Sequence, residues 1–261
     1  MTRQDNGVHF PHDLEPQRPT QVGLIVLQSD ETIEPDLHRL LPPELELLVS
    51  RIPSGAEVTP DTLAAMEGYM TASAALFPGG ARLAAVGYGC TSGTAQIGAA
   101  EVAARIRKAV PAPHVTEPVS ALIAACAALG LRRLALLSPY IAPVSDRLRA
   151  VLAAAGIETP TFGSFLIEEE ARVVRISAGS VLVAGQQLVA ESPEPVDALF
   201  LSCTNLRTLP VIAALEETIG LPVLASNTVL AWHMARLAGA RAQGPGRLLQ
   251  MTTAGTVRAA E

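Results

Sequence analysis

Short apolar runs alternate with helical stretches along almost the whole chain, and this alternation constrains the fold more than any other feature. Strands are expected at the apolar runs and helices between them. Alternation of this kind predicts parallel sheets covered by helices, so the expected fold class is α/β. The predicted strands are 22–27, 45–51, 83–89, 114–117, 133–138, 161–166, 197–202 and 222–226. The predicted helices include 60–76, 96–108, 119–129, 143–154, 179–191, 208–218 and 228–239, and the stretch TIEPDLHRLL (32–41).

The chain also repeats itself, weakly in residue identity but in a consistent order. RLAAVGYGCTSGT in the first half matches VDALFLSCTNLRT in the second, and VGLIVLQSD matches LRRLALLSPY. We therefore predict two pseudo-symmetric lobes, each a mostly parallel sheet flanked by helices. Their strand ends would face each other across an inter-lobe cleft, where such sheets bind ligands. The predicted parts are a flexible arm at 1–19, lobes at 20–130 and 131–240, and a C-terminal segment at 241–261, for which a return to the first lobe stays open.

The composition excludes several classes of protein. A net charge of -6, with no cluster of Lys or Arg, argues against a nucleic acid as partner. No apolar run reaches the about 18 residues that span a bilayer. The first 20 residues are polar and lack the apolar core of a signal peptide. We therefore expect a cytoplasmic protein without a membrane partner; a homodimer or higher homo-oligomer stays open.

The three cysteines divide into one structural residue and one pair. Their odd number and wide spacing argue against a disulfide framework or a zinc site, so no metal is expected. Cys126 lies in the apolar helix SALIAACAALG and is predicted to belong to the core. Cys90 and Cys203 each follow a buried strand and precede a helix, in matching Cys-Thr contexts. A single strand-end cysteine is more often a buried small hydrophobe, but this duplication favours a functional pair.

The surroundings of the two paired cysteines suggest acid–base chemistry. A helix N-terminus presents unpaired N–H groups and a positive dipole end, which favour a thiolate. The same N–H groups can bind a carboxylate. Two thiols that face one carbon from opposite sides form an acid–base pair that needs no metal or cofactor. The predicted binding groups around them are Thr91, Ser92, Thr204 and Asn205.

The motifs GCTSGT and SCTNLRT resemble those of the aspartate/glutamate racemase superfamily. Within it, the chain looks most like the group of maleate isomerases, arylmalonate decarboxylases and ectoine-utilisation protein A. The resemblance covers about residues 20–240 and includes LLSPYIAPVSDRL, which is similar to the tyrosine-bearing loop of the decarboxylases. CTSGT and SNTVLAWHMARLAG look more like the ectoine-utilisation A branch. The resemblance implies a cofactor-independent enzyme that acts at the carbon next to a carboxylate.

The resemblance also implies different roles for the two cysteines. Racemases of this type use both to move a proton between opposite faces of one carbon. Maleate isomerases use the first as a nucleophile and the second as a proton donor, and arylmalonate decarboxylases keep only the second. Because both are present here, decarboxylation is disfavoured. The expected function is thus isomerisation or racemisation, with maleate-like cis–trans isomerisation through Cys90, decarboxylation of malonate-like acids, and a non-catalytic metabolite sensor as alternatives.

Departures from the family pattern concern the substrate. Maleate isomerases usually carry an asparagine where this chain has Asp30, and an apolar residue where it has Thr91. An aspartate facing the cleft would repel a second substrate carboxylate and attract an ammonium group, which suggests an amino-acid-like or acylated diamino-acid substrate from ectoine breakdown. The alternative for Asp30 is a turn or N-cap residue. Three further residues at strand ends are predicted to contact the substrate: Tyr140, Ser226 and Asn227.

Overall fold

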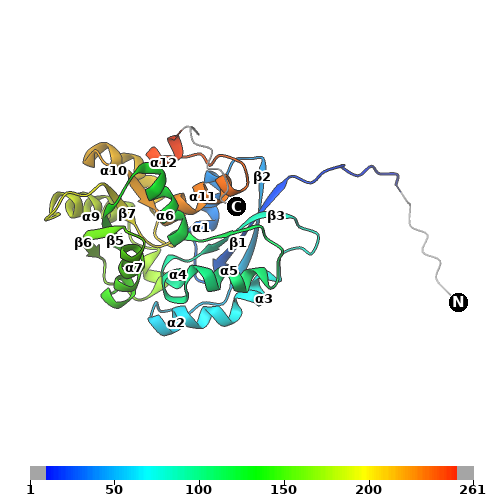
Figure 1. The fold of residues 1–261 in the computed structure, drawn as a ribbon, viewed down its shortest axis with the longest axis horizontal. Coiled ribbons are helices and arrows are strands. Elements are labelled where there is room, and N and C mark those ends of the chain that lie inside the picture. The colour runs from blue at the N-terminus through cyan, green and yellow to red at the C-terminus, as the bar shows by residue number, and fades with distance from the viewer. Residues whose placement is uncertain (1–9, 252–261) are drawn as a thin grey trace.

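The computed structural model describes residues 10–251 and confirms the α/β class, with two four-stranded parallel sheets side by side (Figure 1). The first sheet has the strand order β2-β1-β3-β4 and the second the order β6-β5-β7-β8, which is the same order half a chain later. The pseudo-symmetry predicted from the repeat is thus confirmed. The strands are β1 (Thr20–Leu27), β2 (Leu45–Ile52), β3 (Leu83–Gly89), β4 (His114–Thr116), β5 (Arg133–Ser138), β6 (Glu158–Ser164), β7 (Ala198–Leu201) and β8 (Val223–Ala225).

The helices follow the prediction with local differences. The predicted helix 60–76 is broken at a short 3-10 turn, and the predicted helix 96–108 is two helices separated at Gly98, whose φ of 98° no α-helix accommodates. Two four-residue helices, α8 and α12, were not predicted because one turn carries no periodicity. The helices are α1 (Ile33–Leu40), α2 (Pro60–Ala65), α3 (Met70–Ala74), α4 (Thr91–Ile97), α5 (Ala99–Arg107), α6 (Pro118–Leu129), α7 (Ala142–Ala154), α8 (Glu170–Val173), α9 (Ala178–Ala190), α10 (Ile212–Ile219), α11 (Ser226–Leu237) and α12 (Arg247–Gln250), with 3-10 turns at Met66–Tyr69 and Leu209–Val211.

The last long helix of each half packs on the sheet of the other half. Leu122 and Cys126 of α6 lie in one hydrophobic cluster with Phe200 of the second sheet, so Cys126 is a core residue as predicted. Met234 of α11 packs against β1 and β3 of the first sheet. The fit is close, because a Cβ added to Gly87 of β3 would stand 2.5 Å from the Met234 sulfur. The hydrophobic core therefore crosses the predicted division between the lobes.

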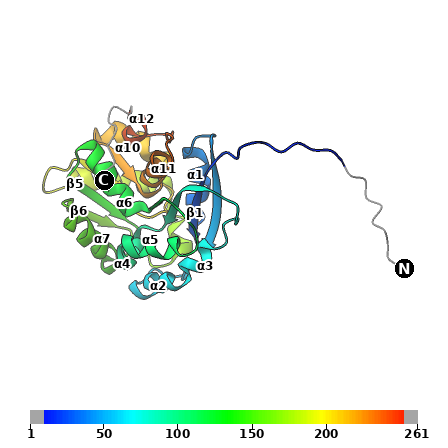
Figure 2. The same ribbon diagram turned by 45° about the vertical axis from the view of Figure 1, so that its right-hand side comes forward.

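Residues 10–19 and the described segment after α11 lie outside the two sheets. Residues 10–19 form no helix or strand and run away from β1 (Figure 2), while the rest of the predicted arm lies outside the described residues. The segment after α11 touches both lobes: the Gln243 N–H donates to the Leu40 carbonyl at 2.8 Å, and the Arg247 guanidinium donates to the Gly220 carbonyl at 2.9 Å. Among the helices within residues 10–251, none is both long and apolar enough to cross a membrane.

Candidate active site

Cys90 lies where β3 ends and α4 begins. It is the N-cap residue of α4, and its Sγ accepts a hydrogen bond from the Gly93 N–H at 3.1 Å. The thiol is almost fully buried and lies close to the backbone of the first helical turn. A Cβ on Gly93 would stand 2.9 Å from both the Cys90 Sγ and the Tyr88 hydroxyl. Gly93, the second glycine of GCTSG, therefore leaves room for the Cys90 thiol.

Cys203 occupies the corresponding position after β7 in the second lobe. Its Sγ lies 2.9 Å from the Tyr140 hydroxyl and accepts the Asn205 N–H at 3.3 Å. The tyrosine hydroxyl also lies 2.7 Å from Glu170 Oε1. The hydroxyl thus lies between the Cys203 sulfur and the Glu170 carboxylate, and its hydrogen can be donated to either of them.

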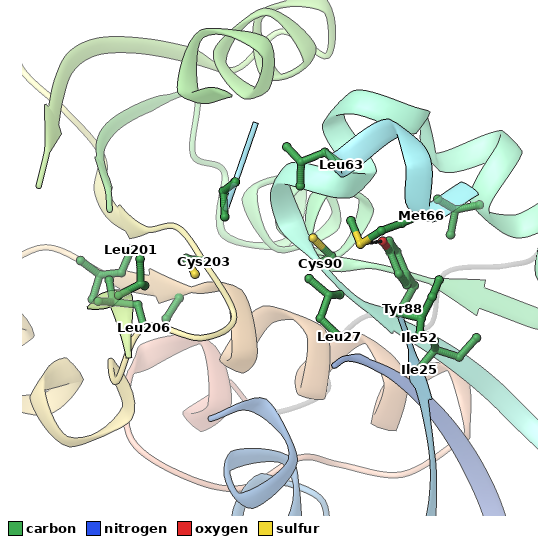
Figure 3. Close-up of a cluster of buried hydrophobic side chains, with 14 of the residues drawn as sticks. Ile25, Leu27, Ile52, Leu63, Met66, Tyr88, Cys90, Leu201, Cys203 and Leu206 are labelled. Atoms are coloured by element: carbon green, nitrogen blue, oxygen red, sulfur yellow. Dashed lines mark hydrogen bonds between the residues drawn. The ribbon is translucent and has the colours of Figure 1, made fainter. Parts of the chain in front are cut away.

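Both thiols line one narrow pocket between the lobes. Figure 3 shows Cys90 beside the first-lobe residues Leu27 and Leu63, and Cys203 beside Leu206 in the second lobe. The strand ends of the two sheets therefore do converge on one site. The pocket is lined by Leu27, Ser29, Asp30, Leu63, Cys90, Thr91, Ser92, Tyr140, Glu170, Cys203, Thr204 and Asn205.

Two of the predicted substrate contacts, Ser226 and Asn227, lie behind the pocket wall. The Ser226 Oγ accepts the Thr91 hydroxyl at 2.8 Å and the Cys203 N–H at 3.1 Å, so it joins the two cysteine loops. The Asn227 amide donates to Asp36 Oδ2 and to the Thr204 carbonyl, both at 2.9 Å. Both side chains hold the pocket residues in place rather than facing the pocket.

Asp30 serves as a helix cap and also lines the pocket. Its Oδ1 accepts the N–H groups of Thr32 and Ile33 at 2.7 and 2.8 Å, just before α1, as the turn or cap alternative predicts. Its other oxygen, Oδ2, is buried and has no hydrogen-bond partner. The two expectations for this residue are thus compatible.

Glu170 is a pocket residue that sequence reasoning missed. Its Oε1 accepts from Tyr140 and its Oε2 accepts the Asn205 amide at 2.9 Å. Two backbone hydrogen bonds fix residues 168–170 against the first lobe. The Glu170 N–H donates to the Ala56 carbonyl, and the Val58 N–H donates to the Glu168 carbonyl. In the sequence, Glu170 ends an acidic run that is typical of a solvated surface. The one sequence signal that indicates a pocket residue is that Glu170 follows the end of the predicted strand 161–166 by a few positions.

Burial keeps both thiols protonated in the empty pocket. Desolvation raises the pKa of Cys90 to about 12; the Gly93 N–H opposes this, and the nearby carboxylates of Glu170 and Asp30 add to it. Burial, and then the charge of Glu170, likewise raise the pKa of Cys203 well above its ordinary value, although the Tyr140 hydroxyl opposes the shift. A helix N-terminus was expected to favour the thiolate at both cysteines. At Cys90 this effect is present but smaller than that of burial. At Cys203 the prediction was wrong, because a turn follows this residue and the next helical turn begins only at Leu209.

The backbone at Cys203 is strained, and this gives a stability prediction. Its φ of 100° lies in a region that side-chain-bearing residues rarely adopt. We expect Cys203→Gly to be about 1 kcal/mol more stable than Cys203→Ala in equilibrium urea unfolding. Cys126, inside α6, is the matched control, where glycine should be less stable than alanine by about 1 kcal/mol. Equal or greater stability of the alanine variant at position 203 would contradict strain there.

Paired thiols from two pseudo-symmetric lobes, held by backbone N–H groups in one buried pocket, are an arrangement suited to catalysis by cysteine side chains. Among residues 10–251, no group of three or more His, Cys, Asp or Glu side chains is arranged to hold a metal ion. The family model described as arylmalonate decarboxylase matches residues 56–249, and the chain belongs to this family.

The relatives of the chain include both decarboxylases and isomerases. An arylmalonate decarboxylase from Bordetella bronchiseptica is 32% identical over 87% of this chain and 95% of its own length. The crystal structure of the maleate isomerase Iso from Pseudomonas putida S16 aligns with a TM-score of 0.78 at 25% identity, over 88% of this chain and 98% of that one.

A third relative bears on the cysteines. It is a mutant of the Nocardia farcinica maleate cis-trans isomerase with a covalently bound succinylcysteine intermediate, and it aligns with a TM-score of 0.74 at 25% identity over 89% of this chain and 99% of that one. These comparisons confirm the predicted group and make the chain an enzyme of the isomerase or lyase kind. The finer resemblance to the ectoine-utilisation A branch stays a prediction.

Proposed function

We propose that this protein is a cofactor-independent isomerase or racemase that acts at the carbon next to a carboxylate of a small substrate. The observation that carries the proposal is that Cys90 and Cys203, from corresponding positions of the two lobes, line the same pocket. Two thiols on opposite sides of a carbon can remove a proton from one face and deliver another to the opposite face.

The proton transfer has two steps. One cysteine, as thiolate, takes the proton next to the substrate carboxylate, and the electrons of the C–H bond move into the carboxylate to form an enediolate. The other cysteine then donates its S–H proton to the opposite face, so that the two cysteines exchange protonation states. The N–H groups at the start of α4 have no partner within that helix. Together with the hydroxyl of Ser92, which lines the pocket, they would stabilise the developing negative charge.

Covalent addition by Cys90 is the second candidate, and the Nocardia relative with its succinylcysteine supports it. In this reaction the Cys90 thiolate forms an S–C bond with one alkene carbon, and the π electrons move to the neighbouring carbon, which Cys203 can protonate. The former double bond can then rotate. Loss of the same proton and expulsion of the Cys90 thiolate would give the other geometric isomer.

Deuterium incorporation and protein mass together test the proposal. The wild-type enzyme would be incubated in D₂O with aspartate, maleate and phenylmalonate, with the double variant Cys90→Ala/Cys203→Ala as the blank. Proton transfer predicts deuterium next to a carboxylate, and covalent addition predicts a mass adduct on Cys90. Loss of CO₂ would indicate the decarboxylase alternative, and binding without turnover the sensor. Activity that survives in the double variant would contradict any role of the thiols.

The proposal also covers the setting of the protein. Its ligand would be a small carboxylate rather than a nucleic acid or membrane. A cytoplasmic location is supported by the three free cysteines, since reducing compartments keep thiols unpaired.

A further inference from the structure

The pocket contains two carboxylic acids and no basic side chain to balance them. Among its twelve lining residues, Asp30 and Glu170 are the titratable acids besides the thiols and the tyrosine, and no Lys, Arg or His is present. Arg51 approaches from outside. Its guanidinium donates to the backbone carbonyls of Leu27 and Asp30 and is paired with the Glu34 carboxylate at 2.9 Å. This cation is therefore already paired and does not line the pocket.

The Asp30 Oδ2 is a buried oxygen without a partner in a pocket that is otherwise well hydrogen-bonded. Asp30 is 3% exposed, so bulk solvent hardly reaches it. The nearby Thr204 hydroxyl lowers the pKa of Asp30, but its hydrogen is donated to the Gly89 carbonyl at 3.2 Å. An ionised carboxylate therefore leaves this oxygen without a full hydrogen bond, and a protonated one leaves its hydrogen without an acceptor. Buried polar groups are rarely left unpaired, and each exception needs an explanation such as an absent ligand.

Glu170 is bonded in a way that suits its ionised form. Both of its oxygens accept hydrogen bonds, one from the Tyr140 hydroxyl and one from the Asn205 amide. The Asn205 amide group can only donate to Oε2, and the Tyr140 hydroxyl can donate to Oε1. Hydrogen bonds of this kind favour the charged carboxylate, whereas burial and the charge of Asp30 raise the pKa of Glu170. A positive group in the pocket would remove this conflict.

We propose that Asp30 and Glu170 form the binding site for a cationic group of the substrate, such as a protonated amine or amidine. This inference rests on the proposed function, which puts a substrate carboxylate near Thr91. The substrate class is then a small molecule with one carboxylate and one cation. A dicarboxylate would bring a second anion next to two buried acids in a pocket without a basic side chain, which is unfavourable at low dielectric.

The same charges connect substrate binding to thiol activation. The negative charges of Glu170 and Asp30 contribute to the raised pKa of both Cys90 and Cys203. A bound cation would offset these charges and make the thiolate form more accessible when the reacting carbon is in place. A substrate without the cation would leave the thiols protonated.

Two probes of matched shape test the proposal by calorimetry. Maleate carries two carboxylates, and (Z)-4-aminobut-2-enoate keeps the cis alkene and one carboxylate but carries an ammonium group on the other side. Binding is measured in the Cys90→Ala/Cys203→Ala background, which removes the thiols from the measurement. We expect the ammonium probe to bind about 10-fold or more tightly than maleate.

The two acids are then replaced in turn. Asp30→Asn is nearly isosteric and keeps the helix cap, because asparagine caps as well as aspartate. It should lower the preference for the ammonium probe, and Asp30→Asn combined with Glu170→Gln should reverse it. Glu117→Gln is the control. Glu117 is a buried acid that caps α6 through the Val119 and Ser120 N–H groups and does not line the pocket, so this variant should leave the preference unchanged.

Tighter binding of maleate, no binding of the ammonium probe at millimolar concentration, or a preference that the Asp30→Asn change does not alter would overturn the cation site. If the Glu170→Gln change prevents folding, Asp30→Asn alone decides. These outcomes are independent of the thiols, because the cysteines are absent from the binding measurement. The thiol proposal fails or holds separately in the deuterium and mass experiment.

Discussion

Removing either thiol is expected to lower turnover by about 10²- to 10⁴-fold, the usual contribution of a positioned acid or base. Cys90→Ala and Cys203→Ala each delete one of the two groups that reach the reacting carbon, and a water molecule in the vacated space would be a poor substitute. The measurement is kcat for the substrate that the deuterium experiment identifies. Cys126→Ala is the matched control, since it removes a buried thiol from the core of α6 and should keep kcat near the wild-type value.

The two single variants also separate the two mechanisms. Under proton transfer, each variant loses racemisation but keeps slow deuterium exchange on the face served by the remaining thiol. Under covalent addition, Cys90→Ala forms no adduct, whereas Cys203→Ala accumulates one because the proton donor is missing. Wild-type kcat in either variant would show that its thiol is not needed for the reaction.

The sequence predicted the fold well because the signal for each strand is local. Buried parallel strands are continuous apolar runs, and every predicted run became a strand with ends shifted by a few residues. The repeat then predicted the pseudo-symmetry. The exchange of α6 and α11 between the lobes could not be predicted in this way. Both helices are buried on several sides, so their residue patterns do not indicate which sheet they cover.

Position along a strand predicts which residues line the pocket where the strand is central in its sheet. Cys90, Cys203, Asp30 and Tyr140 follow central strands of the two sheets, and all four line the pocket. Ser226 follows β8, the edge strand of the second sheet, and it lies behind the wall. The prediction that Ser226 follows a strand was correct. Whether a residue after a strand faces the pocket depends on the order of the strands in the sheet, which was not predicted from the sequence.

Glu170 and the protonation of the thiols depend on tertiary contacts. Glu170 reaches the pocket because its segment pairs with residues 56–58 of the other lobe, a contact between segments more than 100 positions apart. The thiol pKa depends on how completely the lobes exclude water. The position of Cys90 before a helix indicates only the smaller, opposing effect of the N-terminal N–H groups, which lower the thiol pKa.

Replacing Asn205 by leucine is expected to destabilise the protein by about 3 kcal/mol, because several buried groups lose their partners at once. The Asn205 Oδ1 accepts the Glu31 N–H at 2.9 Å, and its amide donates to the Ser29 carbonyl at 3.3 Å and to Glu170. The first two partners belong to the loop after β1, whereas Asn205 follows Cys203. Urea unfolding at equilibrium measures the loss, and a cost below about 1 kcal/mol would show that these bonds add little net stability.

Asn205→Asp separates the two sides of this network. The variant keeps an acceptor for the Glu31 N–H but places a carboxyl oxygen against Glu170 in place of the amide donor. Burial and the charge of Glu170 would raise the pKa of the new carboxyl above its unfolded value. The unfolded chain then releases this proton at lower pH than the folded protein, so the deficit relative to wild type should grow as pH rises from about 4 towards neutral. A deficit that shrinks with rising pH would contradict this placement.

Because the same side chain joins the lobes and follows Cys203, its loss should also misalign the thiols, and kcat should fall even where the variant remains folded.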